Sequence, residues 1–160
     1  MFEKFGEFDS AEELNRKAME LLQNQDFDGV KALAKENGLD EEDAMDFMNG
    51  CMGELASVQT AAVGKLEMEA KEIKLEEIME DWFDFINKQV MEDEEFAKAV
   101  RREGKSLVGC IGELLKWSYK NSYTVDKSIC SAAGIHQQVR MGIPGAMRAR
   151  VIIREYYLEG

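Results

Sequence analysis

The chain has 160 residues, 45% of them hydrophobic, a size that fits one domain or a small core with an appendage and excludes a large multidomain enzyme. Its 32 acidic against 20 basic residues give a net charge of −12, so we expect no uniform coating of nucleic-acid phosphates. A single proline and no alternating β-branched runs predict an all-α fold, a compact multi-helix domain with an acidic N-terminal helical lobe.

Targeting signals and cysteine pairs are not evident. No run of about 18 uncharged apolar residues is present, and the opening MFEKFGEF alternates charge with phenylalanine instead of showing a signal peptide's apolar stretch. The three cysteines are far apart and form no CxxC pair. We therefore expect a soluble protein of a reducing cytoplasm, without membrane contact.

The first third of the chain predicts three short helices that together make the acidic lobe. Ser10 begins a capping box ahead of the first helix. The second helix runs from about 26 to 36, with Phe27 on its apolar face and Gly38 just beyond its end. Asp40 caps the third helix, which is short and acidic.

The middle of the chain predicts one weak helix and one strong helix. Residues 53–73 have a helical pattern with a poor apolar stripe, which is typical of a connecting helix. Residues 75–91 have the clearest three-and-four repeat of apolar side chains, with acids on the other face. Asp93 then caps a helix that ends at Gly104.

The last third predicts the central core helix and a closing helix. Ser106 begins a helix whose inner face includes Leu115. Asp126 caps a short helix, and a turn around Pro144 leads into the final helix over 146–158.

Charge divides the chain unevenly. Residues 1–97 contain 9 basic and 27 acidic residues, a net of −18, whereas residues 98–160 contain 11 and 5, a net of +6. We expect an acidic lobe with its connecting helix over 1–73 and a helical core with a basic C-terminal part over 74–160. The polarity indicates either two functional faces or exposed helices that are simply kept solvated.

No pattern in the chain favours catalysis. His136 is the only histidine, and Cys110 and Cys130 have helical spacing among small apolar residues, which is typical of core positions. Carboxylates one turn apart, such as Glu77 and Asp81, fit a solvated acidic face better than a metal site. We expect no enzyme, no catalytic residue, no metal and no cofactor.

The basic part offers a nucleic-acid contact as one alternative, since its cations alternate with Trp117, Tyr119 and Tyr123. Residues 126–140 also hint at a helix-turn-helix, although Arg140 falls where an apolar anchor belongs. The candidate cations are Arg101, Arg102, Lys105, Lys116, Lys120, Arg140, Arg148, Arg150 and Arg154.

Five blocks of sequence, in order along most of the chain, carry a family resemblance. They are MFEKFGEFDSAEELN, IMEDWFDFI, VRREGKSLVGCIGELLKWS, VDKSICSAAGI and GIPGAMRARVIIREYYL. Together they resemble the PcfK-like family of mobile-element proteins, which includes a group of type II-A anti-CRISPR proteins. The resemblance implies an inhibitor of the type II RNA-guided DNA nuclease, acting in the cytoplasm of a bacterial host cell. The alternative that it leaves open is a nucleic-acid-binding accessory protein of a conjugative plasmid or other mobile element.

The charge pattern provides a physical route for such inhibition. A guide-loaded nuclease holds nucleic acid in channels rich in lysine and arginine, which an acidic protein can occupy in place of phosphates. The expected partner is therefore the type II CRISPR effector nuclease, with or without guide RNA, while the basic part could hold guide RNA, DNA or a second copy. The candidate contacts are Asp40, Glu41, Glu42, Asp43 and Asp46 in one cluster, and Glu76, Glu77, Glu80, Asp81 and Asp84 in another.

Overall fold

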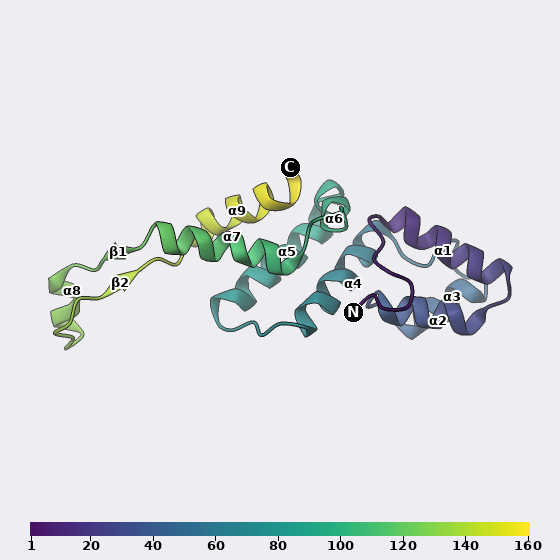
Figure 1. The fold of residues 1–160 in the computed structure, drawn as a ribbon, viewed down its shortest axis with the longest axis horizontal. Coiled ribbons are helices and arrows are strands. Elements are labelled where there is room, and N and C mark those ends of the chain that lie inside the picture. Colours follow the sequence, from purple (N-terminus) through teal and green to yellow (C-terminus); the bar gives the residue numbers. More distant parts are fainter.

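The computed structural model describes residues 1–160 as nine helices and one short antiparallel pair of strands, arranged along one long axis (Figure 1). The predicted all-α class is confirmed, with the strand pair as an unexpected addition. An N-terminal lobe, a helical core and a projecting arm follow one another along the axis. None of the helices has the length and apolar character that crossing a membrane requires.

The N-terminal lobe has its own hydrophobic core of twelve buried residues. Its helices are α1 (Ala11–Gln23), α2 (Phe27–Glu36) and α3 (Glu41–Met48). The Ser10 hydroxyl accepts the Glu13 amide at 3.1 Å, as the capping box predicts, and the Glu13 carboxylate accepts the amide of Asp9. Phe27 is 50% exposed, so its predicted place on the apolar face is wrong: as the first residue of α2 it lies outside the lobe's core.

Helix α4 (Val58–Lys71) contributes to both hydrophobic cores of the molecule. Ala61 belongs to the core of the lobe, and the next residue, Ala62, belongs to the larger core of fifteen buried residues. The predicted start at Gly53 is wrong, because the Ser57 hydroxyl accepts a backbone amide and caps the helix there. The connecting helix α4 thus packs against both the lobe and the core. Its apolar residues therefore face two directions, which explains its poor apolar stripe.

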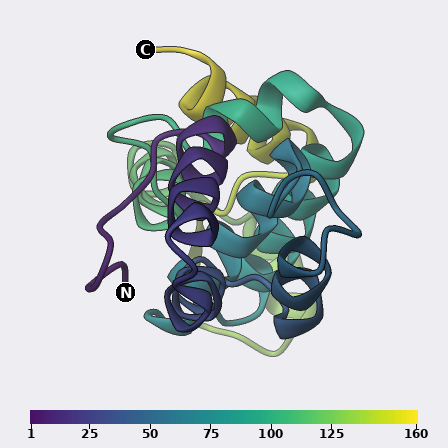
Figure 2. The same cartoon turned by 90° about the vertical axis from the view of Figure 1, so that its right-hand side faces the viewer.

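The helical core lies between the lobe and the arm (Figure 1), and in Figure 2 it lies behind the lobe that faces the viewer. Its helices are α5 (Ile78–Glu92), α6 (Glu94–Val100), α7 (Leu107–Lys120) and α9 (Ala146–Leu158). The final helix has the predicted bounds. Helix α5 begins at Ile78, three residues after the predicted start at residue 75, because Glu77 has a positive φ of 52°. Helix α6 ends at Val100, before the predicted end at Gly104.

Residues 121–145 form an arm that projects from the core at the end opposite the lobe (Figure 1). Strands β1 (Tyr123–Thr124) and β2 (Arg140–Met141) pair antiparallel at its base, and α8 (Lys127–Ala132) lies at its tip. Gly134 ends α8 with a φ of 71°, and the chain then returns in extended form. The helix-turn-helix hint is therefore wrong, because no second helix follows α8 and Arg140 lies in a strand.

Two glycines bring the lobe and α4 into backbone contact. Gly38, just beyond α2, has a φ of 68°, as expected for the residue that ends a helix. A Cβ on Gly64 would overlap the Asn37 carbonyl oxygen, and a Cβ on Gly38 would overlap the Gly64 carbonyl oxygen. The end of α2 can therefore approach α4 only because both positions lack a side chain.

Replacing Gly64 with alanine tests this contact. Overpacking of this kind costs about 1–3 kcal/mol, whereas the better helix propensity of alanine returns up to about 1 kcal/mol. We expect a net loss in the free energy of unfolding, measured by urea denaturation. Glu67→Ala, on the exposed side of the same helix, is the control and should change stability by less than about 0.5 kcal/mol. A Gly64→Ala protein as stable as the wild type would contradict the close approach.

Candidate functional site

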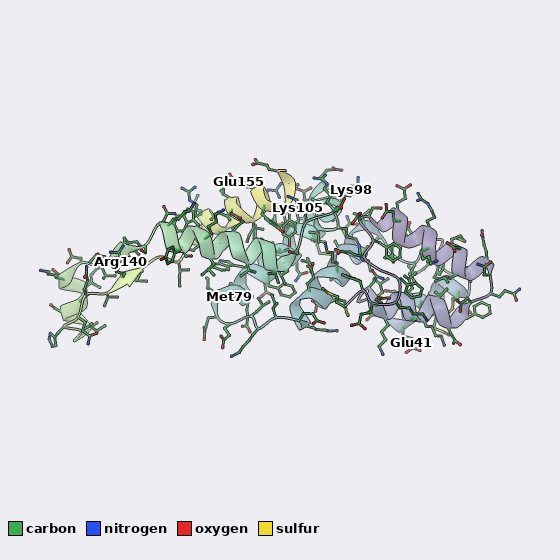
Figure 3. All side chains as sticks on the ribbon, viewed as in Figure 1. Glu41, Met79, Lys98, Lys105, Arg140 and Glu155 are labelled. Carbon is green, nitrogen blue, oxygen red and sulfur yellow. The ribbon has the colours of Figure 1, made fainter.

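The α3 acidic cluster (Asp40, Glu41, Glu42, Asp43 and Asp46) lies on the surface of the lobe. Its first three members are exposed and the other two are half-buried. Asp40 is at the N-cap position of α3 but makes no capping bond with its side chain, so its carboxylate faces water. Figure 3 places Glu41 at the edge of the lobe, pointing away from the core.

All five members of the α5 acidic cluster (Glu76, Glu77, Glu80, Asp81 and Asp84) are exposed. Its first two members precede the helix, so the expectation that one helix concentrates all five charges is wrong. Glu77 is the N-cap residue of α5, and its positive φ turns the chain there, so Glu76 and Glu77 lie just before the helix. The two clusters do not meet: Glu41 lies on the lobe, whereas Met79, at the start of α5, lies on the core (Figure 3).

Almost all of these carboxylates lack an intramolecular cation. Of the ten, only Glu76 forms an ion pair, in which its Oε1 lies 2.6 Å from the Lys74 ammonium. Residues 1–56, which form the lobe, contain 15 acidic and 5 basic residues, a net of −10. The lobe therefore presents negative charge that the chain does not neutralise, and such a surface attracts cationic partners.

Three of the nine candidate cations hold the fold together. The Arg101 guanidinium is 1% exposed and donates to the Asn37 side-chain oxygen at 2.7 Å. Lys105 donates to two backbone carbonyls near the end of α9, at 2.7 and 2.8 Å. Arg154 forms a 3.0 Å ion pair with Asp93 at the start of α6. These three side chains are engaged inside the molecule, and Arg101 cannot reach a ligand at the surface.

The other six candidate cations are exposed but scattered. They are Arg102, Lys116, Lys120, Arg140, Arg148 and Arg150. Arg140 donates to Ser122 and Thr124 and so clamps the base of the arm. Figure 3 shows Arg140 in the arm, far from Lys105 beside α9. The structure does not gather these cations into one continuous groove.

A buried polar cluster at the junction of lobe and core was missed by sequence reasoning. The Lys65 ammonium is fully buried and lies 2.9 Å from the Glu7 carboxylate. It also donates to the backbone carbonyls of Val100 and Lys105, at 2.9 and 2.7 Å. The one signal in the sequence is that residues 58–71 lack a clean polar face, which indicates a helix covered on several sides.

Burial controls the protonation of the groups beside Lys65. Desolvation lowers the pKa of Arg101 to about 10, although the nearby Glu7 and Glu69 carboxylates oppose the change. Desolvation also raises the pKa of Glu69, against the effect of Lys65 and of the Leu107 amide that donates to its carboxylate. Lys65, Glu69 and Arg101 are at most 6% exposed, whereas the Glu7 side chain is 47% exposed. The cluster thus joins the two halves of the protein through three buried groups and one carboxylate at the surface.

The three cysteines and the single histidine differ in burial. Cys110 is buried, and desolvation raises the pKa of its thiol to about 12, so it is protonated at neutral pH. Cys130 is the buried residue of α8, while Cys51 and His136 are exposed. No group of three or more His, Cys, Asp and Glu side chains is placed to hold a metal ion.

Comparisons with known proteins add no relative. No family model matches the chain, and no curated protein or solved structure matches it. Charge, exposure and shape are therefore the properties from which a function can be inferred.

The raised pKa of Glu69 predicts a pH dependence of stability. A carboxyl whose folded pKa is above its ordinary value of 4.5 stabilises the fold most below that pH and loses this contribution as the pH rises through the folded value. The unfolding free energy of the wild type minus that of Glu69→Gln should therefore fall as the pH rises above 4.5. Denaturant titrations across this range measure it, with the exposed neighbour Glu67→Gln as a flat control. A difference that rises with pH would show that pairing with Lys65, not desolvation, dominates.

Proposed function

We propose that the protein is a binding inhibitor of a type II RNA-guided DNA nuclease and that it presents its acidic surfaces to the nuclease's DNA-binding channel. The observation that carries this proposal is that nine of the ten candidate carboxylates have no ion-pair partner within the chain. The resemblance of the five sequence blocks to the anti-CRISPR group of PcfK-like proteins supports the same partner. Binding alone accounts for inhibition, so the proposal needs no catalytic group.

The shape of the molecule suits this role. The lobe, with a net charge of −10, lies at one end of the long axis, and residues 105–160, with a net charge of +4, make up most of the other end (Figure 1). A cationic channel would attract the acidic lobe and so orient the molecule with its lobe toward the channel. The carboxylates then displace anions bound in the channel, as DNA phosphates do, so inhibition should weaken as salt is added.

Neutralising the α3 acidic cluster tests the proposal. The variant carries Glu41→Gln, Glu42→Gln, Asp43→Asn and Asp46→Asn, each of which keeps the size of the side chain. If the four carboxylates contact the channel, losing them should raise the half-inhibitory concentration about tenfold or more, equivalent to about 1.4 kcal/mol or more in total. The measurement adds protein to a guide-loaded nuclease and follows target-DNA binding and cleavage in parallel.

The control removes two carboxylates that the chain already pairs with a cation. Glu94→Gln and Glu95→Gln remove two carboxylates that lie 3.0 Å from the Lys98 ammonium, and potency should hardly change. Thermal melts show whether each variant is folded, since acids in the first turn of α3 also stabilise that helix. A folded α3 variant with full potency contradicts channel occupation by this cluster. If the wild-type protein abolishes cleavage but leaves target-DNA binding by the nuclease intact, that result also contradicts channel occupation and indicates a trapped nuclease conformation.

A second candidate is a nucleic-acid-binding accessory protein of a mobile element. The observation that favours it is the exposed surface of α7, where Lys116 lies one helical turn before Tyr119, which is 88% exposed, and where Lys120 is also exposed. Cations near an exposed aromatic ring are typical of proteins that bind single-stranded DNA or RNA.

This second candidate predicts salt-dependent binding of DNA by α7. Fluorescence anisotropy with a labelled single strand should show an affinity that falls steeply with salt, and Lys116→Gln with Lys120→Gln should reduce the logarithmic salt slope by about one to two. Lys31→Gln with Lys35→Gln, on the lobe, serves as the control with equal charge loss. Absence of binding at low salt would eliminate this candidate.

A further inference from the structure

The tip of the arm forms a cavity of about 490 Å³, which is within the range of about 300–1,000 Å³ that small-ligand sites occupy. This arm-tip cavity is lined by α8 and by the chain segments that lead into it and back out of it. None of its nine lining residues is acidic, whereas Glu113, Glu155 and Glu159 line the hollow between α7 and α9. In a chain with a net charge of −12, a cavity without carboxylates favours an anionic ligand.

The arm-tip cavity has one lysine that the chain leaves unneutralised. Lys127 lines the cavity from the first turn of α8, is exposed and takes part in none of the ion pairs of the chain. The carboxylate next to it in sequence, Asp126, accepts the Ser128 amide at 2.7 Å as the N-cap of α8 and does not line the cavity. His136, the only histidine, lines the cavity from the returning segment. The ammonium of Lys127 is therefore free to bind an anion.

Hydrogen-bond donors around the same cavity are also unused. The backbone amides of residues 136–138 lie outside the helices and strands and donate to no backbone carbonyl. The Gln138 side chain donates to the Thr124 hydroxyl at 3.2 Å, but the Ser131 hydroxyl and the Gln137 side chain, which also line the cavity, have no partner within the chain. Successive free amides beside a lysine are the donors with which proteins bind phosphate groups.

We propose that the arm-tip cavity binds one nucleotide of a single-stranded nucleic acid, with the phosphate held by Lys127 and the free amides of residues 136–138. Val125 and Ile135 give the cavity an apolar wall for the base. The Gln137 amide both donates and accepts, as glutamine does at the edge of adenine. A free phosphate or a phosphoserine side chain would leave the apolar wall and this amide unused, whereas a nucleotide uses every part of the cavity.

The position of the cavity in the molecule agrees with a polyanionic ligand. Residues 121–145 contain one acidic and two basic residues, a net of +1, and α8 lies at the end of the molecule opposite the acidic lobe (Figure 1). A nucleic-acid strand can therefore reach the arm without approaching the net charge of −10 on residues 1–56. The site rests on the second candidate function, nucleic-acid binding, and extends it from α7 to the arm. It does not depend on inhibition through the lobe.

The NMR signals of His136 test this proposal on the full chain. Because the chain has no other histidine, the imidazole C–H signals belong to this residue without further assignment. Titration with adenosine monophosphate, at constant pH and ionic strength, should move these signals along a saturable curve. Inorganic phosphate, which lacks the base, should bind more weakly. A single-stranded adenine oligonucleotide should move the same signals as adenosine monophosphate does.

Variants separate the phosphate from the base. Lys127→Gln should weaken adenosine monophosphate and inorganic phosphate alike, by about tenfold, because it removes a charge-assisted bond. Gln137→Ala should weaken adenosine monophosphate but not inorganic phosphate. Lys71→Gln, which removes an exposed lysine of α4, is the control with equal charge loss and should leave both curves unchanged. Lys127 and Gln137 are exposed, so the circular dichroism spectra should match that of the wild type.

The proposal and the second candidate function can fail separately. Lys116→Gln with Lys120→Gln removes the cations of α7 and should leave the adenosine monophosphate curve of His136 unchanged, whatever it does to the binding of a long strand. Signals of His136 that none of the three probes moves beyond the effect of equal chloride overturn the arm-tip site, as does unchanged affinity in Lys127→Gln. Inorganic phosphate or a phosphoserine peptide that binds as tightly as adenosine monophosphate overturns the assignment to a nucleotide.

Discussion

The buried ammonium of Lys65 is the interaction on which the arrangement of the molecule depends. It binds the Glu7 carboxylate from the N-terminal segment and two backbone carbonyls from the turn between α6 and α7. Taking a charge out of water is costly, and short charge-assisted bonds to all three partners offset that cost. Without the ammonium, the buried Val100 carbonyl would lose this donor, whereas the Glu7 side chain, which is 47% exposed, would be hydrated instead. The contact therefore connects the lobe to the core through groups that no apolar residue could satisfy.

This junction also shapes the surface charge. Lys65, Arg101, Lys105 and Arg154 are four of the 20 cations, and all four are engaged with partners inside the protein. The exposed carboxylates of the lobe are left without these cations as neighbours. Because Gly38 and Gly64 also hold the lobe against α4 by backbone contact, the acidic surface has a defined position relative to the core. A fixed array of like charges is what competition with phosphates requires, since the carboxylates need not be reordered on binding.

Local signals predicted the helices well and the junctions between them poorly. Ser10, Asp126 and Gly38 mark helix ends through bonds or backbone angles within a few residues, and such signals can be read from sequence. The pairing of Lys65 with Glu7 and the packing of Arg101 on Asn37 join segments far apart in the chain, and no local pattern encodes them. Leu115 fits an apolar repeat as well as its buried neighbours do. It is exposed because the arm projects from the core and does not fold back over α7, which is a property of the tertiary arrangement.

The two ends of the molecule constrain one another's functions. An acidic lobe at one end can act as a charged ligand whether the other end is free or paired, whereas the face formed by α7 and the arm has only one occupant at a time. Lys116 lies one helical turn before Tyr119, so any molecule that covered this face would also cover the ring that single-stranded DNA would stack on. Nucleic-acid binding by this face and its burial against another molecule therefore exclude each other. Inhibition through the lobe is compatible with either.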